Sequence, residues 1–164
     1  MKEVEVNKQA MLSEHFSLGE MTKTSYHPVD GNIPSRVAIE NMINLCENWL
    51  EELRHNYNII YCLGAFDDYD TSKDVEPIII NSGFRSAEVN RLCGGATNSN
   101  HLTGCAVDIR CKDKAQAIRY ACILLDIADE KKQDFDELIL ERRGTTIWVH
   151  FAIRPRGNRR YVHF

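Results

Sequence analysis

Residues 99–108 constrain the fold of this chain more than any other segment, because they place His101 and Asp108 seven positions apart around a glycine turn. A neutral imidazole and an ionised carboxylate are both good zinc donors, so this segment supplies two ligands of a metal site that needs a third. We predict that His150, forty-two residues after Asp108, is the third ligand. Three protein ligands and one open position are typical of a catalytic zinc, which makes hydrolysis the leading hypothesis.

The alternation of apolar and polar side chains predicts how these donors could meet. Asp108 alternates with apolar neighbours, which indicates a strand that holds the carboxylate on the face opposite to them. Residues 135–141 and 146–153 are expected to form a hairpin, and in its second strand His150 shares one face with Trp148. An antiparallel neighbour can bring His150 alongside Asp108, at about 5 Å between Cβ atoms.

Apolar residues at helical spacing predict two helices. The first begins near Ser35 and runs to about His55. The second follows the strand that contains Asp108, and its predicted inner face comprises Ala115, Ile118, Cys122, Leu125 and Ala128.

Shorter elements are predicted between the two helices. A buried strand is expected at residues 77–82, and Ser86 is expected to cap a short helix that reaches Leu92. The acidic stretch at residues 66–74 lacks the spacing of an EF-hand and is interpreted as a surface loop. Together these elements indicate an α+β fold.

The length and charge of the chain limit its organisation and its partners. A chain of 164 residues is the size of one domain, in which residues 1–34 form a wrapping arm and residues 154–164 a basic tail. We expect this tail to be solvated and loosely held. A net charge of −4 argues against nucleic acid as a partner. Most of the six cysteines are expected to be reduced core residues, because no CxxC pair occurs.

Several short motifs resemble one known family. These are Ser82-Gly83-Phe84-Arg85-Ser86, Asn90, Gly94-Gly95, the Ser-x-His-x-x-Gly-x-Ala-x-Asp run at residues 99–108, and Trp148-Val149-His150. In order and spacing they resemble the zinc-dependent D-alanyl-D-alanine carboxypeptidases, the M15 peptidases, over about residues 13–153. Residues 15–21 and 32–34 resemble the N-terminal arm of the branch with small single-domain and phage-associated members.

The resemblance implies a fold, a metal and a substrate. The family fold packs helices on a small, mainly antiparallel sheet, as in D-Ala-D-Ala carboxypeptidases and hedgehog-like domains. The resemblance also implies a Zn²⁺ ion held by His101, Asp108 and His150, in an enzyme that cleaves peptidoglycan stem peptides as a D,D-carboxypeptidase or an endopeptidase. We expect the protein to be a monomer. Arg85 would hold a substrate carboxylate or the developing oxyanion, with a structural salt bridge as the alternative. Substrate contacts are expected from Ser82, Ser99 and Trp148.

The chain departs from the family pattern at one position. Members usually carry an acidic general base three residues before the last histidine, and Ile147 stands there. Glu141 resembles another glutamate of this branch, and could be the base or a partner that orients a histidine. Asp136 and Glu137 are interpreted as solvent-facing charges. Two alternatives remain open: a catalytically weakened or inactive module that binds wall peptides, and a metal-free interaction protein.

The sequence also carries an expectation about location. No run of about 18 apolar residues is present, and residues 1–8 lack the apolar core of a signal peptide. We therefore expect a protein that is cytoplasmic as synthesised, and that could be released to the cell wall during phage-type lysis.

Overall fold

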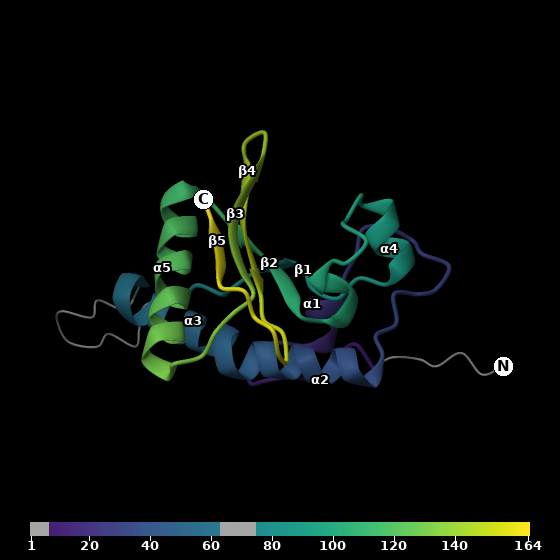
Figure 1. Ribbon diagram of the computed structural model, residues 1–164, viewed down its shortest axis with the longest axis horizontal. Coiled ribbons are helices and arrows are strands. Elements are labelled where there is room, and N and C mark those ends of the chain that lie inside the picture. The colour runs from purple at the N-terminus through teal and green to yellow at the C-terminus, as the bar shows by residue number, and fades with distance from the viewer. Residues whose placement is uncertain (1–6, 63–74) are drawn as a thin grey trace.

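The chain folds around one sheet with helices packed against it, so the predicted α+β class is confirmed (Figure 1). The structure is a computed structural model that describes residues 7–62 and 75–164, so the acidic stretch at residues 66–74 lies outside the described residues. The sheet has five strands in the order β1-β2-β4-β3-β5. Their bounds are Ile80–Ser82 (β1), Ala106–Cys111 (β2), Glu137–Arg143 (β3), Thr146–Ala152 (β4) and Tyr161–His163 (β5).

The sheet is antiparallel except where β5 pairs with β3 in parallel. The hairpin expected around residues 142–145 is confirmed. The strand expected at residues 77–82 is present but shorter, at Ile80–Ser82, and only Ile80 in it is buried. Because side chains alternate along a strand, the sheet has two distinct faces. One face belongs to the apolar core, with Val107, Ile109, Leu138, Val149 and Phe151.

The first predicted helix is confirmed and is longer than expected. Ser35 caps α2 (Arg36–Leu45), which continues through a π-helical turn at Cys46–Leu50 into α3 (Glu51–Tyr57) and a second such turn at Asn58–Cys62. Its buried side reaches the sheet, where the rings of Trp49 and Phe151 lie 5.1 Å apart. This helix therefore anchors the apolar face of β4.

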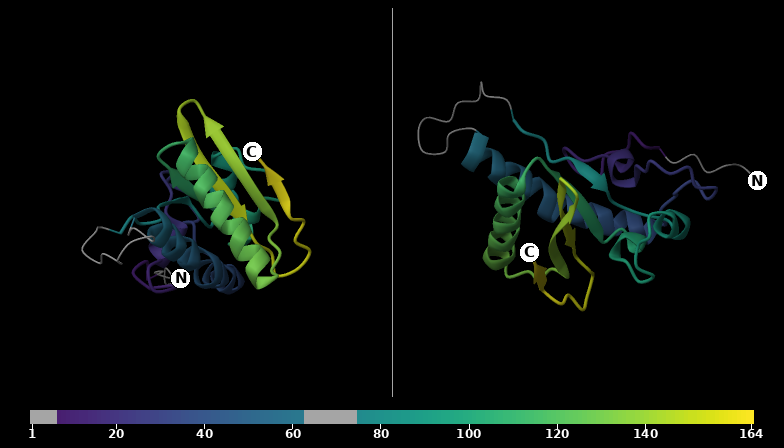
Figure 2. Two further views of the ribbon diagram at one scale, coloured as in Figure 1. Left: turned by 90° about the vertical axis from the view of Figure 1, so that its left-hand side faces the viewer. Right: turned by 90° about the horizontal axis from the view of Figure 1, so that it is seen from above.

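The second predicted helix, α5 (Lys114–Lys131), is confirmed, and its predicted inner face is right for Leu125 and Ala128 but wrong for the other three residues. Ala115, Ile118 and Cys122 are exposed. The face that packs on the sheet instead includes Tyr120 and Gln116, because burying a large aromatic ring outweighs burying Ile118, and Gln116 keeps a hydrogen bond to the Tyr57 hydroxyl at 3.1 Å. Figure 2 shows α5 lying along the sheet.

Short capped elements cover the other side of the molecule. They are α1 (Leu18–Thr22), which begins with a capping box between Ser17 and Glu20, and α4 (Ala87–Leu92), which Ser86 caps as predicted. Within the described parts of the chain, no helix is long and apolar enough to cross a membrane. All six cysteines are free, and three of them are buried: Cys46, Cys105 and Cys111.

The C-terminal segment is exposed, as expected, but the prediction that it is loosely held is wrong. Tyr161 pairs with Glu137 in the β3–β5 register. Arg160 forms ion pairs with Asp129 and Asp134. Strand pairing and ion pairs to residues more than twenty positions away fix this segment against the sheet.

Gly104 joins the turn that contains His101 to β2. Its φ is +72°, a conformation that L side chains rarely adopt, and a Cβ atom there would lie 2.4 Å from the carbonyl oxygen of Ala38. The close approach of α2 to this turn therefore requires glycine.

We expect Gly104→Ala to lower the free energy of unfolding by about 2 kcal/mol or more, because backbone strain and a clash with Ala38 act together. Gly144 is a matched control, since its φ is +60° but no atom lies within 4 Å of an added Cβ. Gly144→Ala should cost only the strain, about 1 kcal/mol. Urea unfolding of both variants measures the difference, and equal losses would show that the contact with Ala38 is unimportant.

Candidate metal centre

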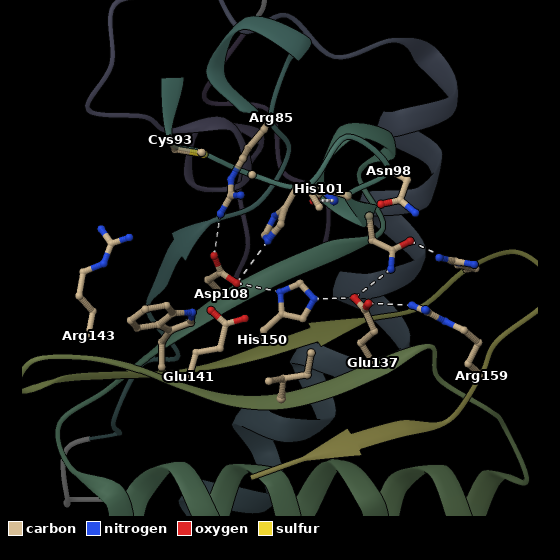
Figure 3. Close-up of a pocket in the computed structure, with 18 of the residues that line it drawn as sticks. Arg85, Cys93, Asn98, His101, Asp108, Glu137, Glu141, Arg143, His150 and Arg159 are labelled. Atoms are coloured by element: carbon tan, nitrogen blue, oxygen red, sulfur yellow. Dashed lines mark hydrogen bonds and ion pairs between the residues drawn. The ribbon is translucent and has the colours of Figure 1, made fainter. Parts of the chain in front are cut away.

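Strand pairing brings two of the three predicted ligands together. Asp108 of β2 and His150 of β4 are direct partners in the antiparallel register. His101 comes from a short 3₁₀ turn, Asn100–Thr103, that leads into β2. One ligand atom from each of the three residues lies within 4.8 Å of the other two (Figure 3). The structure therefore brings together the side chains that the sequence singled out.

The three side chains form a compact, buried group. Oδ1 of Asp108 lies 3.3 Å from Nε2 of His101 and 3.0 Å from Nδ1 of His150. All three residues are at most 8% exposed. A buried carboxylate between two imidazoles offers one oxygen and two nitrogen donors, a set that suits zinc.

Each histidine is oriented by its second ring nitrogen. Nδ1 of His101 donates to the carbonyl oxygen of Gly83 at 2.6 Å, which leaves Nε2 free to face Asp108. His150 is turned the other way, because its Nε2 lies 2.8 Å from Oε2 of Glu137 and its Nδ1 faces Asp108. Such outer contacts commonly fix the orientation of metal-binding histidines.

Arg85 is placed on the other oxygen of the same carboxylate. Its Nη2 donates to Oδ2 of Asp108 at 2.9 Å, and its Nε donates to Oγ of Ser82 at 2.9 Å. Ser82 therefore supports Arg85 rather than lining the cleft. The salt bridge that was the alternative for Arg85 is present, and the guanidinium still borders the cleft.

Asp136 and Glu137 correct an expectation, because neither is a solvent-facing charge. The Asp136 side chain is 0% exposed and pairs with Arg154 and Arg159. Glu137 contacts His150, as described above. Alternation along a strand could have indicated Glu137, since it lies four positions before Glu141 and therefore on the same face. The sequence did not indicate the contacts of Arg159, because no periodic pattern in the C-terminal segment relates this arginine to a residue of β3.

The site opens into a cleft of about 500 Å³. Its floor is the polar face of the sheet, with Glu137, Ile139, Glu141 and Arg143 from β3 and with Trp148 and His150 from β4. Ser99 lines the cleft and accepts a hydrogen bond from the backbone of His101. The indole Nε1 of Trp148 is buried and has no hydrogen-bond partner within the described ranges.

The two candidate positions for a base lie on opposite faces of the sheet. Glu141 is paired with Trp148 across β3 and β4, and its carboxylate points into the cleft toward Asp108 (Figure 3). Ile147 is three positions before His150, so its side chain lies on the opposite face of β4, where it packs against the apolar core. A carboxylate at position 147 would therefore face away from the metal ligands in this strand.

The charges of the group stabilise one another. Burial would raise the pKa of Asp108, but the charge and hydrogen bonds of His101 and His150 hold that pKa well below its usual range. Burial would likewise lower the pKa of His150, but hydrogen bonds to Asp108 and Glu137 raise it to about 9. The hydrogen bond from His150 lowers the pKa of Glu137 to about 2 against its partial burial.

In the metal-free protein, these shifts predict a pH dependence of stability. The pKa of His150 is raised from 6.5 to about 9, so its contribution is complete below pH 6.5 and is lost as the pH rises through 9. The lowered pKa of Glu137 contributes nothing to the slope in this window, because that carboxylate is ionised throughout. We expect the melting temperature to fall more steeply from pH 6.5 to 9 than in His150→Gln. Parallel curves for the two proteins would contradict the assignment.

The comparison with protein families agrees with this geometry. The family model described as Peptidase M15 matches residues 14–150, a span that includes all three candidate ligands. No relative was found among the curated proteins. The match covers most of the chain, and the sheet places His101, Asp108 and His150 in one buried group at the floor of a cleft. The chain therefore belongs to the M15 peptidase family.

Proposed function

We propose that this protein is a zinc-dependent peptidase that hydrolyses peptide bonds in the stem peptides of peptidoglycan. The observation that carries the proposal is the convergence of His101, Asp108 and His150 in one buried group at the floor of an open cleft. Membership of the M15 family supports peptidase chemistry at this site.

The donor set fits zinc. His101 and His150 each turn one ring nitrogen toward Asp108, and each has its other nitrogen bound by an oxygen acceptor. This arrangement of two imidazoles, one carboxylate and oriented outer partners is that of a zinc site with room for a further ligand. Zinc bound there would lower the pKa of a water molecule to about 7 and polarise a peptide carbonyl.

Glu141 is the proposed general base. Its carboxylate lines the cleft and forms no hydrogen bond or ion pair within the parts of the chain that the structure describes. Glu137 is less suitable, because it is held by His150, Asn100 and Arg159 and its pKa is lowered to about 2. A base must be free to contact a water molecule in the cleft, so Glu141, which lines the cleft and lacks these contacts among the described residues, is the better candidate.

Arg85 and Trp148 are proposed to bind the substrate. Arg85 uses Nη2 and Nε on Asp108 and Ser82, which leaves Nη1 for a substrate carboxylate or the developing oxyanion. The buried Nε1 of Trp148 is a donor that a peptide carbonyl could satisfy. With Ser99 at the rim and the exposed Arg143 at the hairpin end, the cleft offers donors to a peptide with free carboxylates.

The experiment that tests this function is digestion of purified peptidoglycan by the zinc-loaded protein, with the products identified by mass spectrometry. Loss of a terminal D-alanine would identify a D,D-carboxypeptidase, and release of cross-linked or longer fragments would identify an endopeptidase. Zinc binding without any product across several wall chemistries would contradict hydrolysis and favour a peptide-binding module. A protein that takes up no zinc would favour a metal-free interaction protein.

A further inference from the structure

The C-terminal segment reaches the metal site through a chain of ion pairs. The family match ends at residue 150, so Arg154 and Arg159 lie beyond it. We propose that Arg159 is a positioning residue, which holds Glu137 on Nε2 of His150 so that Nδ1 faces the site. The inference deepens the proposed function and rests on it for the role of the metal.

Arg159 connects two carboxylates that differ in burial. Its Nε and Nη2 bind the two oxygens of Asp136 at 2.9 and 2.8 Å, and its backbone nitrogen donates to Oδ1 of the same residue. The same Nη2 donates to Oε1 of Glu137 at 2.7 Å. Asp136, which is 0% exposed, therefore anchors an arginine that is itself 52% exposed. Figure 3 shows Arg159 directed at Glu137.

The second oxygen of Glu137 completes the link. Its Oε2 accepts from Nδ2 of Asn100 at 3.0 Å and lies 2.8 Å from Nε2 of His150. Asn100 is in turn bound by Arg154, whose Nε donates to Oδ1 at 2.9 Å. Arg159 therefore contacts the Glu137 carboxylate directly, and Arg154 acts on it through Asn100.

Orientation matters because an imidazole can present either nitrogen to a metal. An acceptor fixed at Nε2 keeps a proton on that nitrogen and leaves Nδ1 available to the site. A glutamate side chain is flexible, and ordering it costs conformational entropy. Other residues must therefore hold Glu137 if its carboxylate is to be a fixed acceptor for His150. Asn100 and Arg159 restrict Glu137 from two sides, and the tail supplies one of these restraints.

Arg160 provides a matched control. It adjoins Arg159 in the same exposed segment, but it pairs with Asp129 and Asp134 and packs over the Phe135 ring. Among the residues that the structure describes, Arg160 forms no hydrogen bond or ion pair with Glu137 or with the candidate ligands. Arg160→Gln therefore removes the same charge from the tail without touching the link to His150.

The test measures zinc affinity by chelator competition for the native chain, Arg159→Gln, Arg159→Lys and Arg160→Gln. Loss of an outer partner of a metal-binding histidine typically costs about 10–100-fold in metal affinity. Arg159 acts through that partner, Glu137, which Asn100 still holds in Arg159→Gln, so we expect a loss at the lower end of this range, about tenfold. Arg159→Lys should lie between that variant and the native chain, because one ammonium cannot fork Asp136 and also reach Glu137. Arg160→Gln should bind zinc like the native chain.

A second measurement follows His150 itself. In the metal-free protein, a hydrogen-bonded Nε2–H should give a low-field proton resonance coupled to ¹⁵N, which Arg159→Gln broadens or removes and Arg160→Gln preserves. Native zinc affinity and an unchanged resonance in Arg159→Gln would overturn the inference. If Arg159→Gln does not fold, Arg159→Lys decides by the same two readouts. A native chain without zinc affinity would contradict the proposed function alone, since the metal-free resonance still tests the positioning of His150.

Discussion

Replacing His101 with alanine is expected to abolish zinc binding and hydrolysis together. The variant removes the nitrogen that faces Oδ1 of Asp108 and leaves only two of the three donors. Loss of an outer partner alone typically weakens metal binding by about 10–100-fold, so loss of a direct ligand should exceed 100-fold. Zinc content after dialysis and digestion of peptidoglycan measure the two effects.

The control is an exposed histidine away from the site. His55 lies in α3 and is exposed, so His55→Ala should keep native zinc content and activity. Because His101 is only 2% exposed, its removal could also disturb folding, and Asp108→Asn offers an isosteric second variant. Full zinc content in both His101→Ala and Asp108→Asn would show that the metal binds elsewhere.

The ligand group could be predicted from sequence because it depends on local patterns. His101 and Asp108 are close in the chain, and the period of two along a strand determines which face each side chain takes. The pairing of Asp108 with His150 then required only that β2 and β4 be antiparallel neighbours, which the structure confirms. The first step is local, and the second needs a single pairing between strands that are distant in sequence.

The surroundings of the group could not be predicted in the same way. Glu137 reaches His150, but its other partner is Arg159, twenty-two positions away in a segment with no apolar pattern. The choice of inner face on α5 failed in part for a related reason, because the buried Gln116 side chain is satisfied by hydrogen bonds to the hydroxyl of Tyr57, the carboxylate of Glu76 and the backbone of Lys112. Buried polar residues depend on partners that the tertiary structure brings to them.

Strand geometry decides how position 147, three residues before His150, should be interpreted. The resemblance described in the sequence analysis led us to expect an acidic residue where Ile147 stands, which suggested a weakened enzyme. In β4, however, Ile147 faces the core and His150 faces the cleft. The absence of a carboxylate at position 147 therefore does not argue against catalysis. Glu141 is the residue to test as the general base.

Replacing Glu141 with glutamine is expected to slow hydrolysis by about 10²–10⁴-fold, the usual contribution of a general base. Zinc affinity should stay close to native, because Glu141 contacts none of the three candidate ligands within the described residues. The rate of peptidoglycan digestion and chelator competition measure the two quantities. This separation distinguishes Glu141→Gln from His101→Ala, which should lose both.

Ile147→Asp provides the complementary test of the base. It adds the carboxylate that the family pattern favours, but on the face that packs against the core. We expect no gain in activity and a loss of stability of up to about 1–3 kcal/mol, because Ile147 is partly buried against the core and a carboxylate there would lose hydration without gaining a partner. A rise in hydrolysis in Ile147→Asp, or native hydrolysis in Glu141→Gln, would contradict the assignment of Glu141. If Glu141→Gln lowers the rate of hydrolysis and Ile147→Asp does not raise it, Glu141 on the cleft face of the sheet is the base.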